Sequence, residues 1–205
     1  MSYKIIVARY NENIEWLNSE MSNCIIYNKG NKLNISNEIL LENVGRESET
    51  YLHYIITNYH NLPDVVVFTQ ARISDHKGID DVHYLISIKN QALEYSKSIN
   101  FSKHNDVGKC INFDKEWNLR KDGFYLKDNY KNNNPITFLE WFKSNININY
   151  PNPLYFYCNA IFAVKKENII NKPLEYYKKL ALEVNHHINS TEGHFFERSW
   201  FYIFS

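Results

Sequence analysis

Cysteine is scarce in this chain, and the positions of the cysteines exclude both a disulfide framework and a cysteine-based metal site. Only Cys24, Cys110 and Cys158 occur among 205 residues, and three scattered cysteines provide neither a disulfide framework nor a metal-ligand spacing. We therefore predict reduced thiols in a cytosol-like compartment, with Cys24 and Cys158 buried inside strands as small hydrophobic residues.

Long apolar runs and an excess of one charge are also missing. No apolar segment approaches the roughly 20 residues that a membrane span needs. The N-terminus runs straight into a strand pattern, which predicts no signal peptide and a cytoplasmic location. The 23 basic and 23 acidic residues cancel, so the composition gives no bulk electrostatic case for binding nucleic acid or an anionic membrane.

Four motifs that define large enzyme classes do not occur either. The sequence contains no GxxxxGKS/T, GxGxxG, HExxH or GxSxG. Their absence argues against a P-loop enzyme, a dinucleotide-binding oxidoreductase, a zincin and a serine hydrolase. What the chain does have is 44% hydrophobic and 16% aromatic residues, enough for the core of one domain, which we expect to span residues 1–205.

Short apolar runs in the first half of the chain predict buried strands. These runs lie at about 4–9, 24–27 and 65–70, and the last is the richest in β-branched residues, which predicts a central strand. A helical pattern follows the first run at 11–21, and a stronger one covers 47–61. Strand, helix, strand predicts an α/β fold with a mainly parallel sheet flanked by helices.

The remaining segments are predicted from the same periodicities. We expect polar loops at 31–44 and 71–76, helices at 82–96 and 135–144, an irregular stretch at 100–135, a strand region at 153–164, a helix opened by Pro173, and a last helix at about 192–203. Ser190 or Thr191 is expected to cap the last helix.

The residues that follow the first strand suit a nucleotide. Arg9, Tyr10 and Asn11 supply a cation for phosphate, an aromatic ring for base stacking and an amide for hydrogen bonds. They are expected at the carboxyl edge of the sheet, where open α/β proteins bind ligands. The alternative is a strand followed by a polar turn that binds nothing.

Four loops are expected to converge at that edge. Arg9, Lys29, Arg46 and Arg72 would then form a local basic cluster in a neutral protein, as a diphosphate requires. Gly45 allows close approach of the backbone, and the helix that starts near residue 47 points free N–H groups at an anion. The alternative for each basic residue is a solvated surface charge.

Two further pairs of residues are candidates for chemistry. Asp75 and His76 follow the central strand and are the best candidates for binding a divalent cation, with His76 favouring manganese. Asp80 and Asp81 lie nearby and could serve instead, and the other alternative is a polar loop without a metal. His194 and Glu197 lie three residues apart on the last helix and share one face, so the carboxylate and imidazole form a candidate general base. The alternative is a solvated helix edge.

Six segments resemble, in order and over nearly the whole chain, a glycosyltransferase-A-like family found in large DNA viruses, fungi and bacteria. They are VARYNE at 7–12, IYNKG at 26–30, NVGRES at 43–48, YL at 51–52, LPD followed by VFTQ at 62–70, and FERSW at 196–200. The first and last are the most specific. The resemblance implies a single-domain glycosyltransferase-A-like fold with a nucleotide-sugar-binding half at 1–98 and an acceptor-side half at 99–205.

The resemblance also implies site residues and a reaction. The nucleotide-sugar site would comprise Ala8, Arg9, Tyr10, Asn11, Tyr27, Asn28, Lys29, Arg46, Gln70 and Arg72. Glu197 and His194 would be catalytic. Most enzymes of this fold carry Asp-x-Asp after the central strand to bind Mn²⁺ or Mg²⁺, and this chain has FTQAR at 68–72 instead. Asp75 and His76 remain the metal candidates, and Arg72 is an alternative source of positive charge.

The resulting prediction is a glycosyltransferase that moves a sugar from a nucleotide-sugar, most simply a UDP-sugar, to a hydroxyl group of a glycan or another acceptor. Inversion at the anomeric carbon is favoured because no buried nucleophile is evident. The first alternative is a non-catalytic nucleotide- or glycan-binding module of the same fold. The second is a domain of a larger transferase whose acceptor site lies elsewhere.

Overall fold

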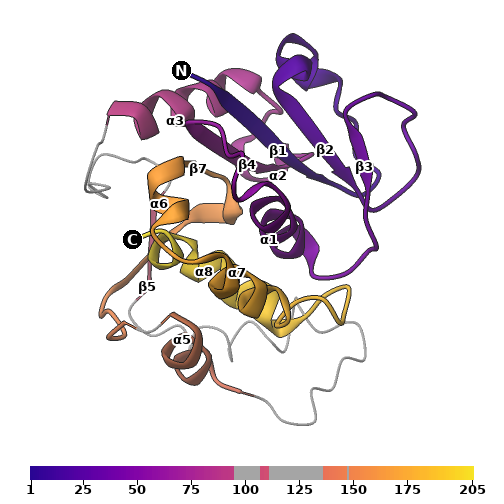
Figure 1. The fold of residues 1–205 in the computed structure, drawn as a ribbon. Coiled ribbons are helices and arrows are strands. Elements are labelled where there is room, and N and C mark those ends of the chain that lie inside the picture. Colours follow the sequence, from indigo (N-terminus) through magenta and orange to yellow (C-terminus); the bar gives the residue numbers. More distant parts are fainter. Residues whose placement is uncertain (95–106, 111–135, 147) are drawn as a thin grey trace.

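The computed structural model describes residues 1–94, 107–110, 136–146 and 148–205. Within these ranges, five strands form a mixed sheet in the order β3-β2-β1-β4-β7 (Figure 1). The strands are β1 (Tyr3–Arg9), β2 (Cys24–Asn28), β3 (Glu38–Leu40), β4 (Val65–Gln70) and β7 (Phe162–Lys165). The first four are parallel, whereas β7 runs antiparallel to β4. The prediction of an α/β fold with a mainly parallel sheet is confirmed.

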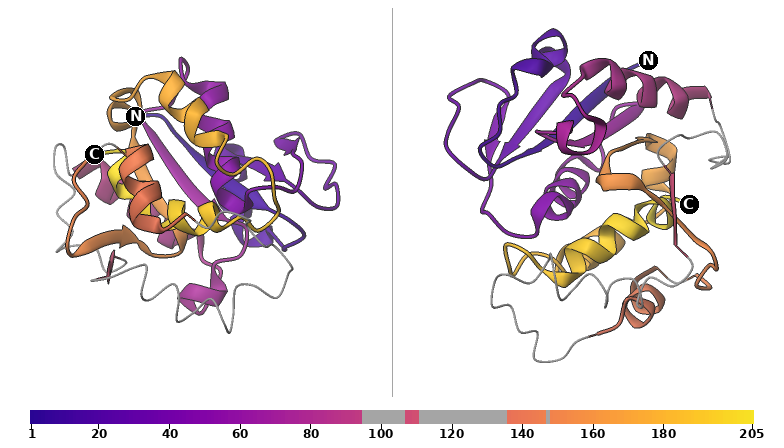
Figure 2. Two further views of the ribbon diagram at one scale, coloured as in Figure 1. Left: turned by 90° about the horizontal axis from the view of Figure 1, so that it is seen from below. Right: turned by 180° about the vertical axis from the view of Figure 1, so that it is seen from behind.

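Helical segments cover both faces of this sheet. The 3-10 helix η1 (Glu15–Asn23) and helix α3 (Val82–Glu94) pack on one face, and α1 (Arg46–Asn58) packs on the other. Helices α7 (Leu174–Ala181) and α8 (Thr191–Ile203) lie beyond α1, and α5 (Phe138–Ile146) packs against α8 (Figures 1 and 2). Two short helices, α2 (Ser74–Lys77) and α6 (Lys166–Ile170), complete the described α-helices.

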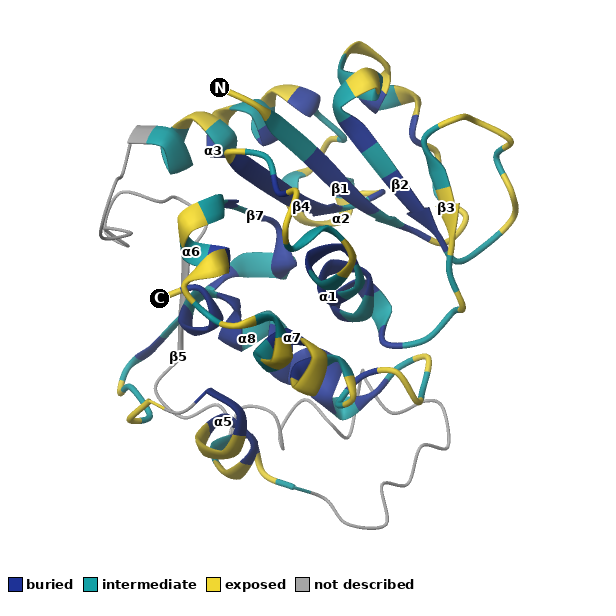
Figure 3. Cartoon of the chain, viewed as in Figure 1, coloured by how far each residue is buried: buried dark blue, intermediate teal, exposed yellow. Residues whose placement is uncertain are grey.

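Alternating residues of the central strands pack into two separate hydrophobic cores, one on each face of the sheet. In β1, Ile6 belongs to the α1 side of the sheet, whereas Ile5 and Val7 belong to the η1 and α3 side. All three are fully buried. Figure 3 shows this burial along β1 and β4. Because both faces are covered, these strands are continuously apolar, and this is why the sequence located them correctly.

The larger core is mostly aromatic. Phe138, Trp141 and Phe142 of α5 have no exposed surface, and Phe138 and Trp141 contact the rings of Phe195 and Phe196 on α8. Ring pairs of this kind add to the free energy gained from burial alone. Helix α8 is thereby held at a fixed position against the rest of the domain, which matters for the polar side chains on its first turns.

Several predicted boundaries were wrong for local reasons. The helix expected at 11–21 is a 3-10 helix that begins at Glu15, since the side chain of Asn13 accepts a hydrogen bond from the Glu15 amide (2.7 Å) and competes with a regular helix. The loop predicted at 31–44 contains β3, which has only three residues and is partly exposed. The loop predicted at 71–76 contains the start of α2.

The strand region predicted at 153–164 is two strands of different sheets. Strand β6 (Leu154–Tyr157) pairs with β5 (Val107–Cys110), whereas β7 pairs with β4. The turn η4 (Cys158–Ala160) separates them, because Asn159 and Ala160 adopt the left-handed conformation. Cys158 therefore lies in a turn and not in a strand, while Cys24 is buried in β2 as predicted. The side chain of Cys110, and most of 100–135, lie outside the described residues.

The later helices match the prediction more closely. Helix α1 and helix α3 occupy most of the ranges predicted for them, and α5 begins three residues after the predicted start at 135. Ser190 caps α8 by accepting a hydrogen bond from the Gly193 amide (3.2 Å). Pro173 precedes the first residue of α7, where its missing N–H costs nothing. Among the described residues, no helix is both long enough and apolar enough to cross a bilayer.

Gly30 allows the loop after β2 to touch the loop after β1. A Cβ atom at Gly30 would lie 1.7 Å from the carbonyl oxygen of Tyr10. We expect Gly30→Ala to lower the free energy of unfolding by about 1–3 kcal/mol or more, because backbone must move to relieve the overlap. Urea unfolding measures this change.

A second glycine provides the control for this substitution. Gly78 has a φ of +81°, and a Cβ atom added there would have no heavy atom within 4 Å. Gly78→Ala therefore introduces only the left-handed strain of about 1–2 kcal/mol. Equal, small effects of the two substitutions would show that the contact between Gly30 and Tyr10 does not constrain the loops.

Candidate active site

The carboxyl edge of the sheet brings the predicted loops together. Chain order runs from β1 outward to β2 and β3, and the chain then returns to place β4 on the other side of β1. The change of direction between β1 and β4 is a topological switch point, the place where α/β sheets bind ligands. Arg9 ends β1, Asn28 ends β2 and Gln70 ends β4 at this edge.

Arg9 is turned into the protein. Its Nε donates to the carbonyl of Glu12 (2.9 Å), and its Nη1 donates to Asn28 Oδ1 (2.8 Å) and the Asn31 carbonyl (3.0 Å). The residue is only 7% exposed. These hydrogen bonds join the loop after β1 to the loop after β2. Arg9 therefore stabilises the carboxyl edge of the sheet, and its described contacts are all with protein acceptors.

The neighbours of Arg9 differ in exposure. Tyr10 is 51% exposed and Asn11 is exposed, so both present groups to solvent at the edge. Asn11 Oδ1 also accepts from the Asn31 amide (2.8 Å). Ala8 is half-buried within β1, whereas Tyr27 is 1% exposed beneath α1. Of the predicted nucleoside contacts, Tyr10 and Asn11 are the ones placed to meet a ligand.

Lys29 is also turned inward. Its Nζ donates to the carbonyls of Val44 (2.5 Å) and Arg46 (2.6 Å) and forms an ion pair with Glu49 (2.8 Å). Burial lowers the pKa of Lys29, and the nearby carboxylate of Glu49 opposes that shift. The lysine predicted to face a phosphate instead holds the backbone that leads into α1.

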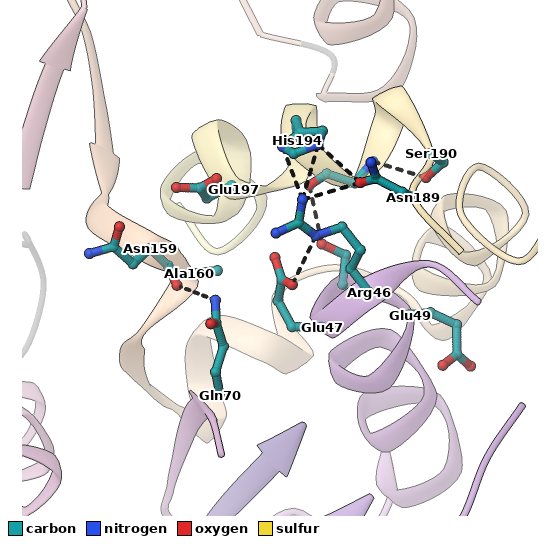
Figure 4. Close-up of polar contacts among 12 residues, drawn as sticks. Arg46, Glu47, Glu49, Gln70, Asn159, Ala160, Asn189, Ser190, His194 and Glu197 are labelled. Atoms are coloured by element: carbon teal, nitrogen blue, oxygen red, sulfur yellow. Dashed lines mark hydrogen bonds and ion pairs between the residues drawn. The ribbon is translucent and has the colours of Figure 1, made fainter. Parts of the chain in front are cut away.

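Arg46 lies at the first turn of α1 in a left-handed conformation, with a φ of 52°. Its Nη1 is 3.0 Å from His194 Nε2 and 3.2 Å from Asn189 Oδ1, and its Nε is 3.5 Å from Glu47 Oε2. The side chain remains 35% exposed. Figure 4 shows the guanidinium between the start of α1 and the start of α8. Arg46 is therefore a partly exposed cation whose direction is fixed by α8.

His194 accepts from this arginine as a neutral ring. A guanidinium only donates hydrogen bonds, so the imidazole nitrogen that faces it carries a lone pair. Burial, and then the positive charges of Arg46 and Arg198, lower the pKa of His194 to about 3. The residue is 6% exposed. His194 thus orients Arg46 at neutral pH without competing for an anion.

Glu197 lies one turn further along α8. Its side chain is 19% exposed, and Oε1 forms an ion pair with Arg198 Nη1 (2.5 Å). In Figure 4 Glu197 lies on the same side of α8 as His194 and beside the Asn159–Ala160 turn. A partly buried carboxylate held by one cation keeps its second oxygen available to accept a hydrogen bond.

The end of β4 is joined to the turn before β7. Gln70 Nε2 donates to the Asn159 carbonyl (3.0 Å), as Figure 4 shows. Glu47, Asn159 and Asn189 were not among the predicted site residues. The signal for Asn159 was one polar residue inside an apolar run, and Asn189 stands one residue before the helix cap. Neither of these sequence features shows that Asn159 contacts Gln70 or that Asn189 contacts Arg46, because both partners are distant in sequence.

The predicted metal residues lie in the short helix α2 that follows β4, which has no buried residue. Asp75 Oδ2 is paired with Arg72 Nη2 (2.9 Å) and with Arg72 Nε (3.0 Å), and His76 is exposed. Asp80 Oδ1 accepts from the amides of Ile73 and Ser74. Within the described ranges, no three His, Cys, Asp or Glu residues form a group that could hold a metal. Binding of a cation at Asp75 and His76 stays a prediction, and the arrangement gives it no further support.

The comparisons with known proteins identify the family. Residues 5–205 match the family described as "Protein of unknown function (DUF3431)", and the chain belongs to this family. Neither the curated proteins nor the solved structures contain a match. The α/β sheet and its switch-point edge are therefore the firmest guides to function.

The low pKa of His194 predicts a pH dependence of stability. The unfolded chain binds a proton at His194 below about 6.5, whereas the folded chain does not until about 3. The stability contributed by the neutral ring is present above 6.5 and is lost as the pH falls toward 3, by about 1.4 kcal/mol per pH unit. We expect His194→Gln to flatten the decline in unfolding free energy between pH 6 and 4.

His60→Gln is the control, because His60 is exposed. Urea unfolding at several pH values should give wild-type pH dependence for this variant. The same slope in the wild type and in His194→Gln would show that His194 is protonated in the folded protein.

Proposed function

We propose that the chain is a glycosyltransferase that takes its sugar from a nucleoside diphosphate donor, with the glycosyltransferase-A-like fold that its sequence resembles. The observation that carries the proposal is the contact of Arg46 from α1 with His194 from α8 beside the switch point of the sheet, with Glu197 one helical turn further along α8 (Figure 4). A donor of this kind needs a cation at the diphosphate and a base near the anomeric carbon.

The nucleoside is assigned to the end of β1. Tyr10 supplies an exposed ring for stacking on a base and Asn11 supplies an amide. Arg46 faces the diphosphate from the next part of the edge. It is partly exposed, and the bonds to His194 and Asn189 restrict the directions that its guanidinium can take. Such a pre-oriented donor stabilises developing charge better than a freely rotating one.

In the proposed reaction, Glu197 accepts the proton of the acceptor hydroxyl as the hydroxyl oxygen attacks the anomeric carbon. The bond between that carbon and the diphosphate oxygen breaks, and the nucleoside diphosphate leaves with its electron pair. Arg46 stabilises the charge that grows on the leaving group. A single displacement inverts the anomeric configuration. A bound Mn²⁺ or Mg²⁺ would add positive charge at the diphosphate, and Asp75 and His76 remain the residues proposed for it.

Titration with UDP tests the donor site directly. We expect UDP to bind to the wild type and to raise its melting temperature. The measurement is made in parallel with and without Mn²⁺. Arg46→Gln is expected to weaken binding at least about tenfold, since a charge-assisted contact to phosphate is worth about 1.5–3 kcal/mol. Lys178→Gln removes an exposed cation of α7 and should leave the affinity unchanged.

Turnover separates the enzyme from the alternative. Hydrolysis or transfer from one of a panel of nucleotide-sugars would support the proposal. Binding without turnover, unchanged by Glu197→Gln, would instead favour a non-catalytic module of the same fold. No binding of any nucleoside diphosphate would rule out the transferase and the nucleotide-binding module, and would leave a glycan-binding module.

A further inference from the structure

The turn between β6 and β7 is held in an unfavourable backbone conformation. Asn159 has a φ of 62° and Ala160 has a φ of 54°. Asparagine tolerates the left-handed region, but alanine does so at a steric cost because its Cβ approaches the following carbonyl oxygen. Two successive residues of this kind persist only where the surrounding structure holds them, and such places concentrate at functional sites.

Two hydrogen bonds from different elements hold this turn. Gln70 at the end of β4 donates to the Asn159 carbonyl (3.0 Å), and the hydroxyl of Tyr51 on α1 donates to the Ala160 carbonyl (3.0 Å). Tyr51 has no exposed surface, and its ring packs against Phe68, Phe162 and Trp200. The hydroxyl is thus aimed at one backbone oxygen by a completely packed ring.

The position of the turn connects it to the candidate site. The turn packs against α8 as well as β4, and Figure 4 shows it beside Glu197, on the opposite side from Arg46. Tyr51 stands one helical turn after Glu47, so a single rigid helix carries Arg46 at its start and holds the turn through Tyr51. The separation between Arg46 and the Asn159–Ala160 turn therefore depends on α1 and on the hydroxyl of Tyr51.

We propose that Tyr51 is a positioning residue, whose hydroxyl fixes the Asn159–Ala160 turn as the wall of the site beside Glu197. This inference rests on the proposed function, because the reaction there defines what is positioned. The group on the turn's side of the site is the transferred sugar, whereas the nucleoside diphosphate lies nearer Tyr10 and Arg46. Removal of the hydroxyl should lower turnover and leave the affinity for UDP unchanged.

Tyr51→Phe and a matched variant test this role. Tyr177 is also fully buried, and its hydroxyl donates to a backbone carbonyl, that of Ile169 (2.7 Å). Because each substitution deletes one buried hydrogen bond and keeps the ring, both should lower the melting temperature by a similar amount, about 2–4 °C. We expect Tyr51→Phe to reduce kcat about tenfold with UDP affinity within twofold of wild type, and Tyr177→Phe to leave kcat unchanged.

A second substitution tests whether the effect passes through the turn. Glycine adopts a positive φ without steric cost, so Ala160→Gly allows the turn to keep its conformation when the hydroxyl is gone. The double variant Tyr51→Phe with Ala160→Gly should recover kcat to within about threefold of wild type. Hydrogen exchange of the amides at 154–165 provides a readout apart from activity, and we expect faster exchange in Tyr51→Phe but not in Tyr177→Phe.

The outcomes separate this inference from the proposed function. Equal losses of kcat in the two tyrosine variants, unchanged exchange at 154–165, or no recovery in the double variant would overturn the role of Tyr51. A wild-type protein that binds no nucleoside diphosphate and turns over no donor would overturn the proposed function and the positioning role with it. Faster exchange in Tyr51→Phe would then show only that the hydroxyl holds the turn.

Discussion

Replacing Lys29 with methionine is expected to lower the free energy of unfolding by about 3–5 kcal/mol, the usual cost of removing one partner from a buried ion pair. The lysine side chain is 5% exposed, and its ammonium serves the Glu49 carboxylate and the carbonyls of Val44 and Arg46. Methionine fills a similar volume but removes the ammonium from all three acceptors. Urea unfolding at pH 7 measures the loss.

An exposed ion pair provides the comparison. Lys178 pairs with Glu175 at 2.7 Å, but the two side chains are 48% and 77% exposed. Lys178→Met should change stability by no more than about 0.5 kcal/mol, because water replaces the lost contact. If Lys29→Met costs as little as Lys178→Met, the ammonium of Lys29 does not hold the chain that leads into α1, and a role in ligand binding becomes the better account of it.

Replacing Glu197 with glutamine is expected to reduce turnover by about 10²–10⁴-fold while leaving UDP affinity within twofold of wild type. Glutamine preserves the size of the side chain and an oxygen that accepts from Arg198, but it cannot take up the acceptor proton, a step worth this factor in enzymes that use a general base. Initial rates of sugar transfer and a UDP titration of the same preparations measure the two quantities.

Glu175→Gln is the matched control for Glu197→Gln. It makes the same chemical change at a 77% exposed site on α7 and should leave both turnover and UDP affinity unaltered. If Glu197→Gln retains full turnover, Glu197 is not the base. If it loses UDP affinity as well, the carboxylate acts in holding the donor and not in proton transfer.

The strands that carry the edge were predictable because burial on both faces leaves a continuous apolar signal. Strands β1 and β4 were found within one residue of their bounds. The same signal failed at 153–164, where the residues are mostly apolar but Asn159 and Ala160 turn the chain from one sheet into another. Apolar periodicity reports burial, and it carries no information about which partner strand is reached.

The candidate site was less predictable than the fold. The sequence predicted that Arg9, Lys29, Arg46 and Arg72 gather at one edge. The structure brings Lys29 into contact with the backbone of Arg46, whereas Arg72 pairs with Asp75 at an exposed position. Whether a cation faces outward depends on nearby carbonyl groups, as for Arg9 and the Asn31 oxygen. Backbone acceptors of that kind leave no trace in residue identity, so inward and outward arginines look alike in a sequence.

The contact between Arg46 and His194 shows a different limit of prediction from sequence. The two residues are 148 positions apart, and their encounter depends on the aromatic packing that seats α8 on the domain. The predicted pairing of His194 with Glu197 used only the spacing along one helix. Burial is the largest cause of the low pKa of His194, and Arg46, the charged group that lowers it most, comes from another helix, so nothing local to α8 points to it.

The direction of β7 decides which segment closes the site. A parallel fifth strand would have left its exit at the carboxyl edge, and a crossover helix would have followed it there. Because β7 is antiparallel to β4, the chain enters β7 at the carboxyl edge of the sheet. The turn that precedes β7 therefore forms a wall of the site, and the residues that follow β7 leave from the opposite edge. Under the proposed function, a change in the sugar that is accepted would arise just upstream of β7, at positions 157–161, where an insertion must fit between two sheets.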